Sequence, residues 1–387
     1  MKKVVISVML IFLCLVIGFS SSIKFVYAEN EGYTARALYL IDYNTGEVLY
    51  EKNSNAKMPV ASIVKLMTIL LTIENIEAEK LSLEETVIVS ENAAGMGGSQ
   101  VFLEAGGEYK VKDLLKSVIV SSANDSSVAL AERISGSVSG FVELMNNRAK
   151  SLGLVDTKYV NPTGLPAPSQ FSSAKDVAKL LKEVSKYDIY HKFSTIWIDK
   201  ISHSNNRETE LVNTNKLVRY FNGCDGGKTG STSEAGYCLA TTAKRGDMRL
   251  ISVVLGAENG KLRFAESSKL LNYGFDNFFN KKIVSEAEEI ENSIKIKYGN
   301  VDNISVKSKE DIYLLCKKNA KDKIEVKYDF FENIEAPVSE GDVVGKVYVI
   351  KNGEVVRESE VISSTTVLKR SYIDNINKTI ENWKIAG

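Results

Sequence analysis

One apolar stretch, Pro59-Val-Ala-Ser-Ile-Val-Lys-Leu-Met-Thr-Ile-Leu-Leu71, constrains the fold more than any other part of this chain. Apolar residues occupy nearly every side of the helix that it would form, which is typical of a helix inside a domain rather than on its surface. Proline suits the first position of a helix, because the N–H that it lacks would be unpaired there. The sequence therefore predicts a buried helix that begins at Pro59.

Two polar side chains, Ser62 and Lys65, interrupt this apolar surface, and their spacing of three residues places them side by side on the helix. Burial disfavours the charged form of a lysine and lowers its pKa, so the amine can take a proton from a neighbour. The Ser62 hydroxyl is then a candidate nucleophile, and the positive end of the helix dipole favours negative charge that develops near it. The alternative is a core helix that carries one serine and one snorkelling lysine.

The composition is that of an ordinary globular chain, and 387 residues are expected to form two domains. Its 49 basic residues balance 49 acidic ones without a long basic block, so we expect no nucleic-acid partner. Cys224, Cys238 and Cys316 occur without a C-x-x-C pair, which indicates neither a disulfide framework nor a cysteine metal site. Only His191 and His203 are available as histidine bases, so lysine is the more plausible base. We expect no metal and no other cofactor.

The N-terminal segment has the pattern of a signal peptide. Lys2 and Lys3 precede an apolar run, Val4–Phe19, and Val26-Tyr-Ala28 resembles a cleavage site with small residues. We expect residues 1–28 to be removed after Ala28, so that the mature chain is exported. A retained signal anchor is the alternative.

Residues 29–282 mix helical and strand patterns and are predicted to form one α+β domain. Its expected elements are a hairpin over Ala37–Leu49, helices over Val111–Ser121, Phe141–Leu152, Ala174–Val184 and Arg263–Phe279, and strands over Tyr237–Ala243 and Met248–Leu255. Ser122 and Asn124 fall in a short loop between two helices, a normal place for catalytic side chains. The glycine-rich stretch Gly95–Ser99 is interpreted as a tight connection in preference to a ligand loop.

The stretch Asp225-Gly-Gly-Lys-Thr-Gly230 looks like a phosphate-binding loop but lacks its spacing. That pattern requires a glycine where this chain has Asn222, and it requires a helix to follow. Two strands follow instead, so we exclude a nucleotide site. Lys228-Thr-Gly230 is expected to begin a strand whose edge faces a cleft.

The sequence pattern in the last third of the chain differs from that of residues 29–282. Residues 283–365 are expected to form a small all-β domain, because short alternating runs recur between polar turns, at Ile294, Ile304, Ile312, Ile324 and Val347. Residues 366–387 combine apolar residues at helical spacing with basic residues and Trp383. This pattern predicts an amphipathic helix at the outer face of the cytoplasmic membrane. A terminal helix that docks on the β domain or on a partner is the alternative.

Ser62-x-x-Lys65, Ser122-x-Asn124 and Lys228-Thr-Gly230 occur in this order in a chain that is expected to be exported. The ordered set resembles the active-site motifs of the penicillin-recognising serine acyl-transferases. The surrounding sequence is similar to the low-molecular-mass penicillin-binding proteins that act as D-alanyl-D-alanine carboxypeptidases. The segments that carry this similarity include Met96-Gly-Gly-Ser-Gln-Val-Phe102, Asn161-Pro-Thr-Gly-Leu165, Asp225-Gly-Gly-Lys-Thr-Gly230 and Gly246-Asp-Met-Arg-Leu-Ile-Ser-Val-Val-Leu-Gly256.

The resemblance implies a β-lactamase/transpeptidase-like domain, in which helices flank an antiparallel sheet and the Ser62 helix lies at the centre. It also implies a mechanism in which neutral Lys65 takes the proton of Ser62, and Ser62 attacks the penultimate D-alanine of a peptidoglycan stem peptide. Ser122 would relay a proton to the leaving amine. The residues that the resemblance assigns to substrate binding are Asn124, Lys228, Thr229, Gly230, Ser231 through its backbone N–H, and Arg263. β-Lactams would inhibit the enzyme by acylating Ser62.

Three alternatives to a carboxypeptidase stay open at the level of sequence. A class A β-lactamase shares the three motifs and adds a Glu-x-x-x-Asn loop. Glu143 and Asn147 have that spacing but fall in a predicted helix, so we attribute the match to chance. A penicillin-binding wall sensor would keep the fold without turnover, and a D,D-endopeptidase would cleave cross-links instead of releasing D-alanine.

Overall fold

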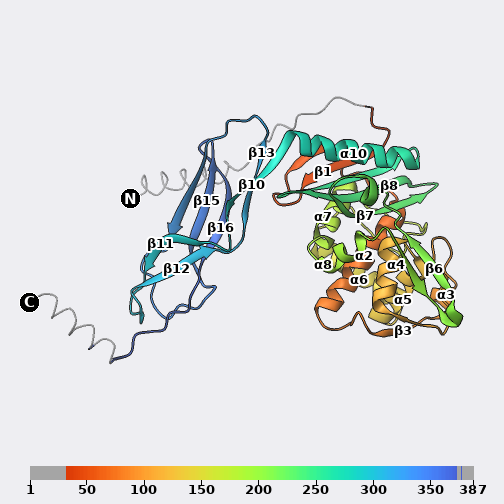
Figure 1. Cartoon of the computed structure of the whole chain (residues 1–387), viewed down its shortest axis with the longest axis horizontal. Helices are drawn as coiled ribbons and strands as arrows, with labels where there is room; N and C mark the ends of the chain where they lie inside the picture. Colours follow the sequence, from red (N-terminus) through yellow and green to blue (C-terminus); the bar gives the residue numbers. More distant parts are fainter. Residues whose placement is uncertain (1–31, 373–375, 377–387) are drawn as a thin grey trace, which may run out of the picture. The chain divides into compact units, whose positions relative to one another are not determined.

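The structure is a computed structural model that describes residues 32–372 and residue 376 of the chain (Figure 1). The signal peptide expected at residues 1–28 and most of the helix expected at residues 366–387 lie outside this range. Within the described range, no helix combines the length and the apolar character needed to cross a bilayer.

The first domain is built on a five-stranded antiparallel sheet with the strand order β2-β1-β9-β8-β7. The strands are β1 (Ala37–Asp42), β2 (Val48–Lys52), β7 (Cys224–Thr232), β8 (Gly236–Arg245) and β9 (Met248–Ala257). β8 and β9 lie inside the sheet, and most of their residues are buried. β7 forms one edge, so one side of its backbone has no neighbouring strand. The hairpin and the two consecutive strands were predicted from sequence at these positions.

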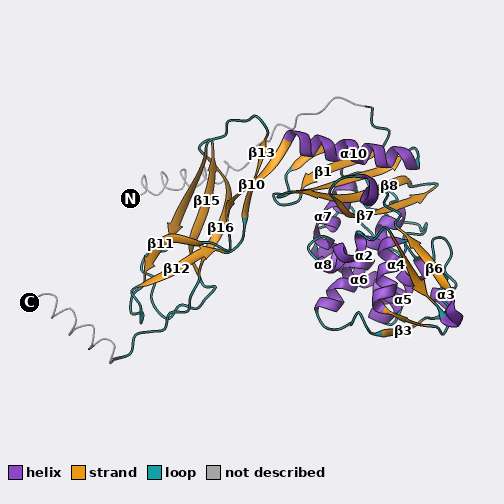
Figure 2. Cartoon of the chain, in the orientation of Figure 1, coloured by secondary structure: helices purple, strands orange, loops and turns teal. Residues whose placement is uncertain are grey.

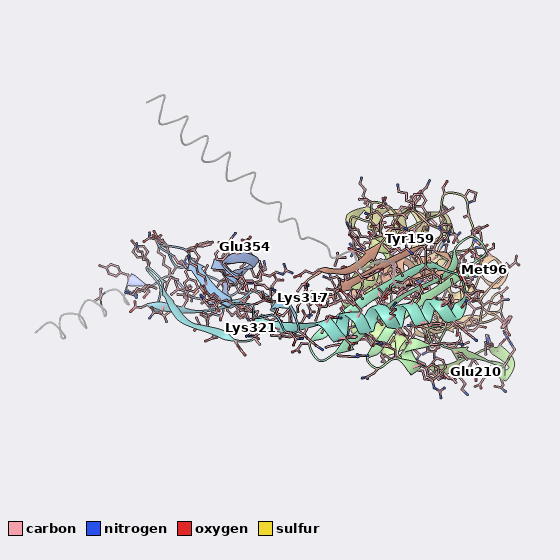
Figure 3. The ribbon with its side chains drawn as sticks, turned by 90° about the horizontal axis from the view of Figure 1, so that it is seen from above. Met96, Tyr159, Glu210, Lys317, Lys321 and Glu354 are labelled. Atoms are coloured by element: carbon pink, nitrogen blue, oxygen red, sulfur yellow. The ribbon has the colours of Figure 1, made fainter. Side chains whose placement is uncertain are left out.

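Helices cover both faces of this sheet (Figure 2). Helix α10 (Gly260–Asn277) lies along one face, and the other helices gather on the opposite side (Figures 1 and 3). The α-helices of that side are α2 (Lys65–Glu77), α3 (Glu91–Ala94), α4 (Val111–Val120), α5 (Asn124–Ser135), α6 (Val138–Ser151), α7 (Ala174–Val184), α8 (Asp188–Ser194) and α9 (Leu217–Tyr220). Two short hairpins, β3 (Thr86–Ile88) with β4 (Glu108–Lys110) and β5 (Ile198–Ser202) with β6 (Glu208–Val212), complete the domain.

The central helix, α2, is buried as predicted, but it begins at Lys65 rather than at Pro59. Residues Lys65–Ile73 of α2 are buried on every side, because helices and the sheet surround them. A short 3₁₀ helix, η1 (Ala61–Val64), leads into α2, and Pro59 lies exposed before it. The prediction that Pro59 occupies the first helical position was therefore wrong. Ser62 lies in the 3₁₀ turn, one turn before α2.

The second part of the chain is all β, with its own apolar core of valine and isoleucine side chains. Its strands are β10 (Phe278–Val284), β11 (Glu289–Lys295), β12 (Asn303–Ser308), β13 (Ile312–Lys317), β14 (Ile324–Phe330), β15 (Val343–Lys351) and β16 (Glu354–Ser363). Five of them form a sheet in the order β11-β12-β16-β15-β14, and β10 pairs with β13. Four of the five alternating runs found in the sequence fall within strands, and the run that starts at Ile294 extends beyond the end of β11.

Extended pairing continues beyond β16 towards the C-terminus. Val367 forms a bridge with Val338, and Lys369 forms one with Gly299. These described residues, within the range expected to be helical, therefore still belong to the β domain.

Candidate active site

The Ser62 hydroxyl and the Lys65 amine form the centre of the candidate site. The 3₁₀ turn and the first residue of α2 place Lys65 Nζ 3.0 Å from Ser62 Oγ. Lys65 is completely buried, whereas Ser62 is partly exposed. The two side chains that the sequence paired by spacing are thus in hydrogen-bonding contact.

A distant backbone carbonyl fixes the position of the Lys65 amine. Nζ donates a hydrogen bond of 2.5 Å to the carbonyl oxygen of Thr163, and the Thr68 hydroxyl donates one of 2.8 Å to Pro162 O. Burial lowers the pKa of Lys65 well below its ordinary value, and the nearby positive charge of Lys228 lowers it further. A neutral amine that donates to Thr163 keeps a lone pair, which can accept the Ser62 proton.

Two glycines press against the backbone that carries Ser62. A Cβ atom on Gly164 would lie 2.1 Å from Ala61 O, and one on Gly230 would lie 2.9 Å from Ser62 N. Ala61 has a φ of +49°, a left-handed conformation that non-glycine residues rarely adopt. The backbone at the nucleophile is therefore held in an unusual conformation between two closely packed segments.

Ser122 lies in the turn between α4 and α5, also in a left-handed conformation, with a φ of +65°. Its hydroxyl is buried and has no hydrogen-bond partner among the described residues. A buried hydroxyl normally has a partner, and unpaired ones are characteristic of functional sites. The hydrogen-bonding capacity of this hydroxyl is thus unused by the described residues.

Asn124 is the first residue of α5 rather than a loop residue as predicted. Its side-chain Nδ2 donates a 2.7 Å hydrogen bond to Gly97 O, while its backbone N–H donates to Ser99 O. The Oδ1 atom is buried, and the described residues supply no partner for it. The glycine-rich stretch is thus a connection, as interpreted, but one that orients Asn124.

Asp125 also holds the glycine-rich segment in place, and the sequence analysis did not assign it a role in the site. Its fully buried carboxylate accepts hydrogen bonds from the backbone N–H groups of Val101, Leu103 and Ser126. Because the first two donors lie in the segment after the glycines, Asp125 ties that segment to the start of α5. No spacing rule identifies such a contact, since the donors are main-chain groups.

Strand β7 contributes the third motif to the site. Lys228, Thr229 and Gly230 lie within the strand rather than at its start, and all three are buried. Burial, together with the positive charge of Arg263, lowers the pKa of Lys228 to about 7. Ser231 follows at an exposed position.

Arg263 reaches β7 from helix α10. Its Nη1 donates a 3.3 Å hydrogen bond to Gly230 O, and the guanidinium carbon lies 5.6 Å from the centre of the Tyr237 ring. Nε is buried and has no partner in the described part of the chain. Burial lowers the pKa of Arg263 from its ordinary value.

The structure gathers these residues around the Ser62 backbone from four segments. Ser62 and Lys65 bond directly, Gly230 packs on Ser62 N, Arg263 bonds to Gly230, and Lys228 is close enough to Lys65 to lower its pKa. Among the described residues, no hydrogen bond joins Ser122 or Asn124 to the Ser62–Lys65 pair. Thr163 and Gly164 were missed as site residues, although the sequence marked their loop by its prolines and glycine.

No group of three or more possible metal ligands was found among the described residues.

Comparison with protein families gives two matches that together span most of the chain. Residues 25–259 match the model of the D-alanyl-D-alanine carboxypeptidase family. Residues 278–369 match the model of the C-terminal domain of penicillin-binding protein 5. The second match covers the all-β part of the structure.

Known proteins are similar to this chain over 64–90% of its length. D-alanyl-D-alanine carboxypeptidase DacF of Bacillus subtilis (strain 168) is 40% identical over 354 residues, which cover 90% of each chain. The structure of penicillin-binding protein 5 from Haemophilus influenzae is 32% identical, with a TM-score of 0.74, and covers 87% of this chain and 98% of that chain. Penicillin-binding protein D2 of Listeria monocytogenes in its ampicillin-bound form is 32% identical, with a TM-score of 0.57, over 64% of this chain and 99% of that chain.

Proposed function

The chain belongs to the D-alanyl-D-alanine carboxypeptidase family, and from this premise we propose how it acts. It is a serine-type hydrolase that removes the terminal D-alanine from peptidoglycan stem pentapeptides. The reaction passes through an acyl-enzyme on Ser62, and no metal or organic cofactor takes part in it.

One observation carries the assignment of the nucleophile and base. Lys65 Nζ lies 3.0 Å from Ser62 Oγ in a position that solvent does not reach, and its pKa is well below the ordinary value. A buried, neutral amine at hydrogen-bonding distance is what activation of a serine requires. Neither histidine is needed for this chemistry.

Acylation begins when Lys65 takes the Ser62 proton and Ser62 Oγ bonds to the carbonyl carbon of the penultimate D-alanine. The negative charge moves to the carbonyl oxygen, where the backbone N–H groups of Ser62 and Ser231 stabilise it. The C–N bond then breaks, and the leaving amine of D-alanine takes a proton that Ser122 relays from Lys65. Water later attacks the ester carbonyl, and the bond to Ser62 Oγ breaks. The proton of the water passes through Lys65 and Ser122 to Ser62 Oγ, which restores the hydroxyl.

The remaining site residues position the substrate. Asn124 holds the substrate amide, for which its unpaired Oδ1 is an available acceptor. Lys228 supplies positive charge, while Thr229 and Arg263 bind the terminal carboxylate. Gly230 lets β7 lie directly against the backbone of Ser62, because a Cβ atom there would lie 2.9 Å from Ser62 N.

Mass spectrometry of the products from a synthetic pentapeptide tests this function. The wild-type protein should release one D-alanine and leave a tetrapeptide, and Ser62→Ala should release none. Release of D-alanine by Ser62→Ala at the wild-type rate would overturn the assignment. A protein that is acylated by labelled penicillin yet releases no D-alanine would instead be a penicillin-binding sensor.

Two enzymatic alternatives are distinguished by the same assay with other substrates. A D,D-endopeptidase would cleave a cross-linked dimer faster than the pentapeptide. A β-lactamase would hydrolyse penicillin with rapid turnover. A class A β-lactamase has a Glu-x-x-x-Asn loop at its site, and the described residues form no such loop there. Glu143 and Asn147 both lie in α6, as the sequence predicted.

We also propose that the chain is exported through residues 1–28 and attaches to the outer face of the cytoplasmic membrane through its C-terminal segment. That segment carries basic residues among apolar ones, namely Lys369, Arg370, Lys378 and Lys384 with Tyr372, Ile373, Ile376, Ile380 and Trp383. Tyr372 and Ile376, which the structure describes, both have helical backbone. A basic amphipathic helix with tryptophan binds at a lipid interface.

Exposed apolar side chains beside the start of this segment support the attachment. Tyr298 is 59% exposed, Leu368 is 61% exposed and Tyr372 is 81% exposed. The backbone N–H of Arg370 donates to Tyr298 O, so these residues belong to one end of the β domain. Aromatic and apolar side chains next to basic residues suit the headgroup region of a bilayer.

A further inference from the structure

The Tyr190 hydroxyl has no role in the mechanism above, yet it contacts the strand that carries Lys228. Tyr190 belongs to α8 and is among the largest side chains that the described structure buries completely. Its Oη accepts a 2.8 Å hydrogen bond from the backbone N–H of Gly227, which lies directly before Lys228. Burial raises the pKa of Tyr190, so the group stays a neutral hydroxyl at neutral pH.

This hydrogen bond lies at the open edge of β7. Successive residues of an antiparallel strand direct their main-chain groups alternately towards a neighbouring strand and away from it. The pairing of β7 with β8 is regular from Gly227 to Thr232. Because the Gly227 N–H points to Tyr190, the N–H groups of Thr229 and Ser231 point to the same open side. In the proposed function, the substrate binds along this side, and Ser231 N–H stabilises the oxyanion.

Side chains hold the start of β7, where its pairing with β8 is irregular. Asp225 is bulged out of the ladder between the two strands. Ser194 Oγ donates a 2.6 Å hydrogen bond to Asp225 O, and Asn215 Nδ2 donates one of 3.1 Å to Gly226 O. Together with the bond to Tyr190, these contacts fix the three residues that precede the Lys-Thr-Gly motif.

Two glycines allow α8 and β8 to lie this close to the strand. A Cβ atom on Gly226 would lie 2.9 Å from both Tyr190 Cε1 and Ser194 Oγ. A Cβ atom on Gly227 would lie 2.4 Å from Ala240 O, and the φ of Gly227 is +141°, which other residues rarely adopt. The contact between Tyr190 and β7 is therefore closely packed on both sides.

The position of the Lys228 amine depends on this strand. Lys228 is completely buried, and its Nζ donates a 3.1 Å hydrogen bond to Thr229 O in the same strand. The amine therefore moves together with the backbone that Tyr190 holds. Its positive charge also lowers the pKa of Lys65, so a displaced strand alters both lysines. A misplacement of about 1 Å can lower the rate of an enzyme by about 10²-fold.

We infer that Tyr190 is a positioning residue for this reaction, whose hydroxyl sets the place of Lys228 and of the β7 edge along which the substrate binds. Tyr190 touches no substrate and transfers no proton, because it acts through the backbone of Gly227. Ser194 supports it from the next turn of α8. The inference rests on the proposed carboxypeptidase function and adds to it a residue outside the three motifs.

Kinetics of Tyr190→Phe test the inference, because this variant removes one oxygen and keeps the aromatic ring in the core. The substrates are a pentapeptide with a free terminal carboxylate and the same peptide with a terminal amide. For the carboxylate peptide, we expect kcat/KM per site that labelled penicillin acylates to fall about tenfold, as for a displacement smaller than 1 Å. The amide peptide should lose less, since it lacks the charge that Lys228 attracts.

The pH profile gives a second readout, which loss of stability alone would not move. Burial, together with the charge of Arg263, holds the pKa of Lys228 at about 7. A displaced strand admits water to the amine, so the pKa of Lys228 should rise towards its ordinary value. In Tyr190→Phe, the decrease in kcat/KM for the carboxylate peptide should therefore occur at higher pH than in the wild type.

Two further variants complete the test. Tyr39→Phe removes a hydroxyl from a buried tyrosine in β1, which β9 and β8 separate from β7. This matched control should keep the wild-type ratio of the two peptides and the wild-type pH profile. Ser194→Ala removes a second contact from α8 and should change both readouts in the same direction as Tyr190→Phe. It decides the test if Tyr190→Phe does not fold.

Two results overturn the inference while the carboxypeptidase function stands. One is a peptide ratio and a pH profile in Tyr190→Phe, or in Ser194→Ala where it replaces that variant, equal to those in Tyr39→Phe. The other is an equal fall for both peptides with an unchanged pH profile, which would make Tyr190 a residue of the core alone. Failure of the proposed function has a different signature, since the wild-type protein would then release no D-alanine in a manner that depends on Ser62.

Discussion

At the scale of residues, the site depends on two lysines that the fold keeps out of water. Lys65 and Lys228 are both completely buried, and their positive charges disfavour each other. Burial penalises an ammonium group strongly, so the protein stabilises the neutral amine at physiological pH. Lys65 can therefore act as a base, while Lys228 gains or loses its charge near neutrality.

Replacement of Lys65 by methionine should separate reactivity from stability. We expect Lys65→Met to slow acylation of Ser62 by labelled penicillin by about 10²–10⁴-fold, the usual contribution of a positioned base. The midpoint of thermal unfolding should change little, because an apolar side chain of similar length replaces a desolvated amine. Lys216→Met, at an exposed position, is the matched control and should acylate normally. Acylation of Lys65→Met at the control rate would show that another group is the base.

The pH dependence of kcat/KM should report the charge of Lys228. The pKa of Lys228 is about 7, below its ordinary value, so the ammonium form is present below pH 7 and is lost as the pH rises. We expect kcat/KM for a substrate with a free carboxylate to fall above about pH 7, because the attraction to Lys228 disappears. A substrate with a C-terminal amide should lack this fall. The same fall for both substrates would assign the titration to a different group.

At the scale of elements, two glycines set the path of the turn that carries Ser62. Gly164 belongs to the proline-rich loop and Gly230 to β7, and a side chain on either would meet the backbone of Ala61 or Ser62. The loop and the strand are distant in sequence, so the conformation of the turn is a property of their packing. This packing explains why Ala61 has a left-handed φ without being a glycine.

Gly164→Ala should impair acylation beyond its effect on stability. Gly153→Ala is a matched control, since both glycines have a positive φ but nothing lies within 4 Å of a Cβ at Gly153. Backbone strain should cost each variant roughly 1–2 kcal/mol in the free energy of unfolding, measured with urea. Gly164→Ala should lose more than this, because its Cβ would lie 2.1 Å from Ala61 O. Only Gly164→Ala should also slow penicillin acylation, by at least tenfold, because its methyl group displaces Ala61. Equal acylation by the two variants would mean that the turn tolerates displacement.

Local sequence patterns identified most elements but not the details that long-range packing decides. Helix α7 has the predicted bounds, Ala174–Val184, because its apolar spacing and serine cap are local signals. Strand β16 was not predicted, since its residues alternate poorly and its neighbours β12 and β15 define it. The start of the central helix was placed at Pro59 because no local signal reveals the glycines that shape η1.

The candidate site was predictable where chemistry follows spacing and unpredictable where it depends on main-chain groups. Ser62 and Lys65 were paired from their spacing alone, and the structure places them 3.0 Å apart. The carbonyl of Thr163 and the N–H groups bound by Asp125 have no side-chain signature. Their roles follow from the tertiary fold.

At the scale of the whole molecule, an all-β domain follows the domain that carries the site, and exposed aromatic residues mark the end of the described chain. Tyr298 has a φ of +59° and is more than half exposed, so burial does not offset its backbone strain. Together with Tyr372, it gives this end of the β domain an apolar surface next to basic residues. We propose that this surface contributes to attachment to a membrane.

Removal of residues 372–387 should abolish membrane binding without loss of catalysis. The truncated protein should release D-alanine from a soluble pentapeptide at the rate of the protein that lacks only residues 1–28. In a flotation assay, that longer protein should bind vesicles with anionic lipid, whereas the truncated protein should stay in solution. Neutral vesicles are the control for the charge contribution. Vesicle binding by the truncated protein would place the attachment elsewhere.

The hydrogen bond from Lys65 to the Thr163 carbonyl limits the effect that mutations at position 163 can have. Lys65 Nζ donates its hydrogen bond to the backbone carbonyl oxygen of Thr163. Every amino acid carries a backbone carbonyl, so no single replacement at position 163 can remove this acceptor. A mutation can weaken this contact only by rerouting the loop, which the hydrogen bonds of Asn161 and Gln170 oppose. Resistance to inhibitors that acylate Ser62 is therefore expected to arise elsewhere, through altered access to the serine rather than through loss of its base.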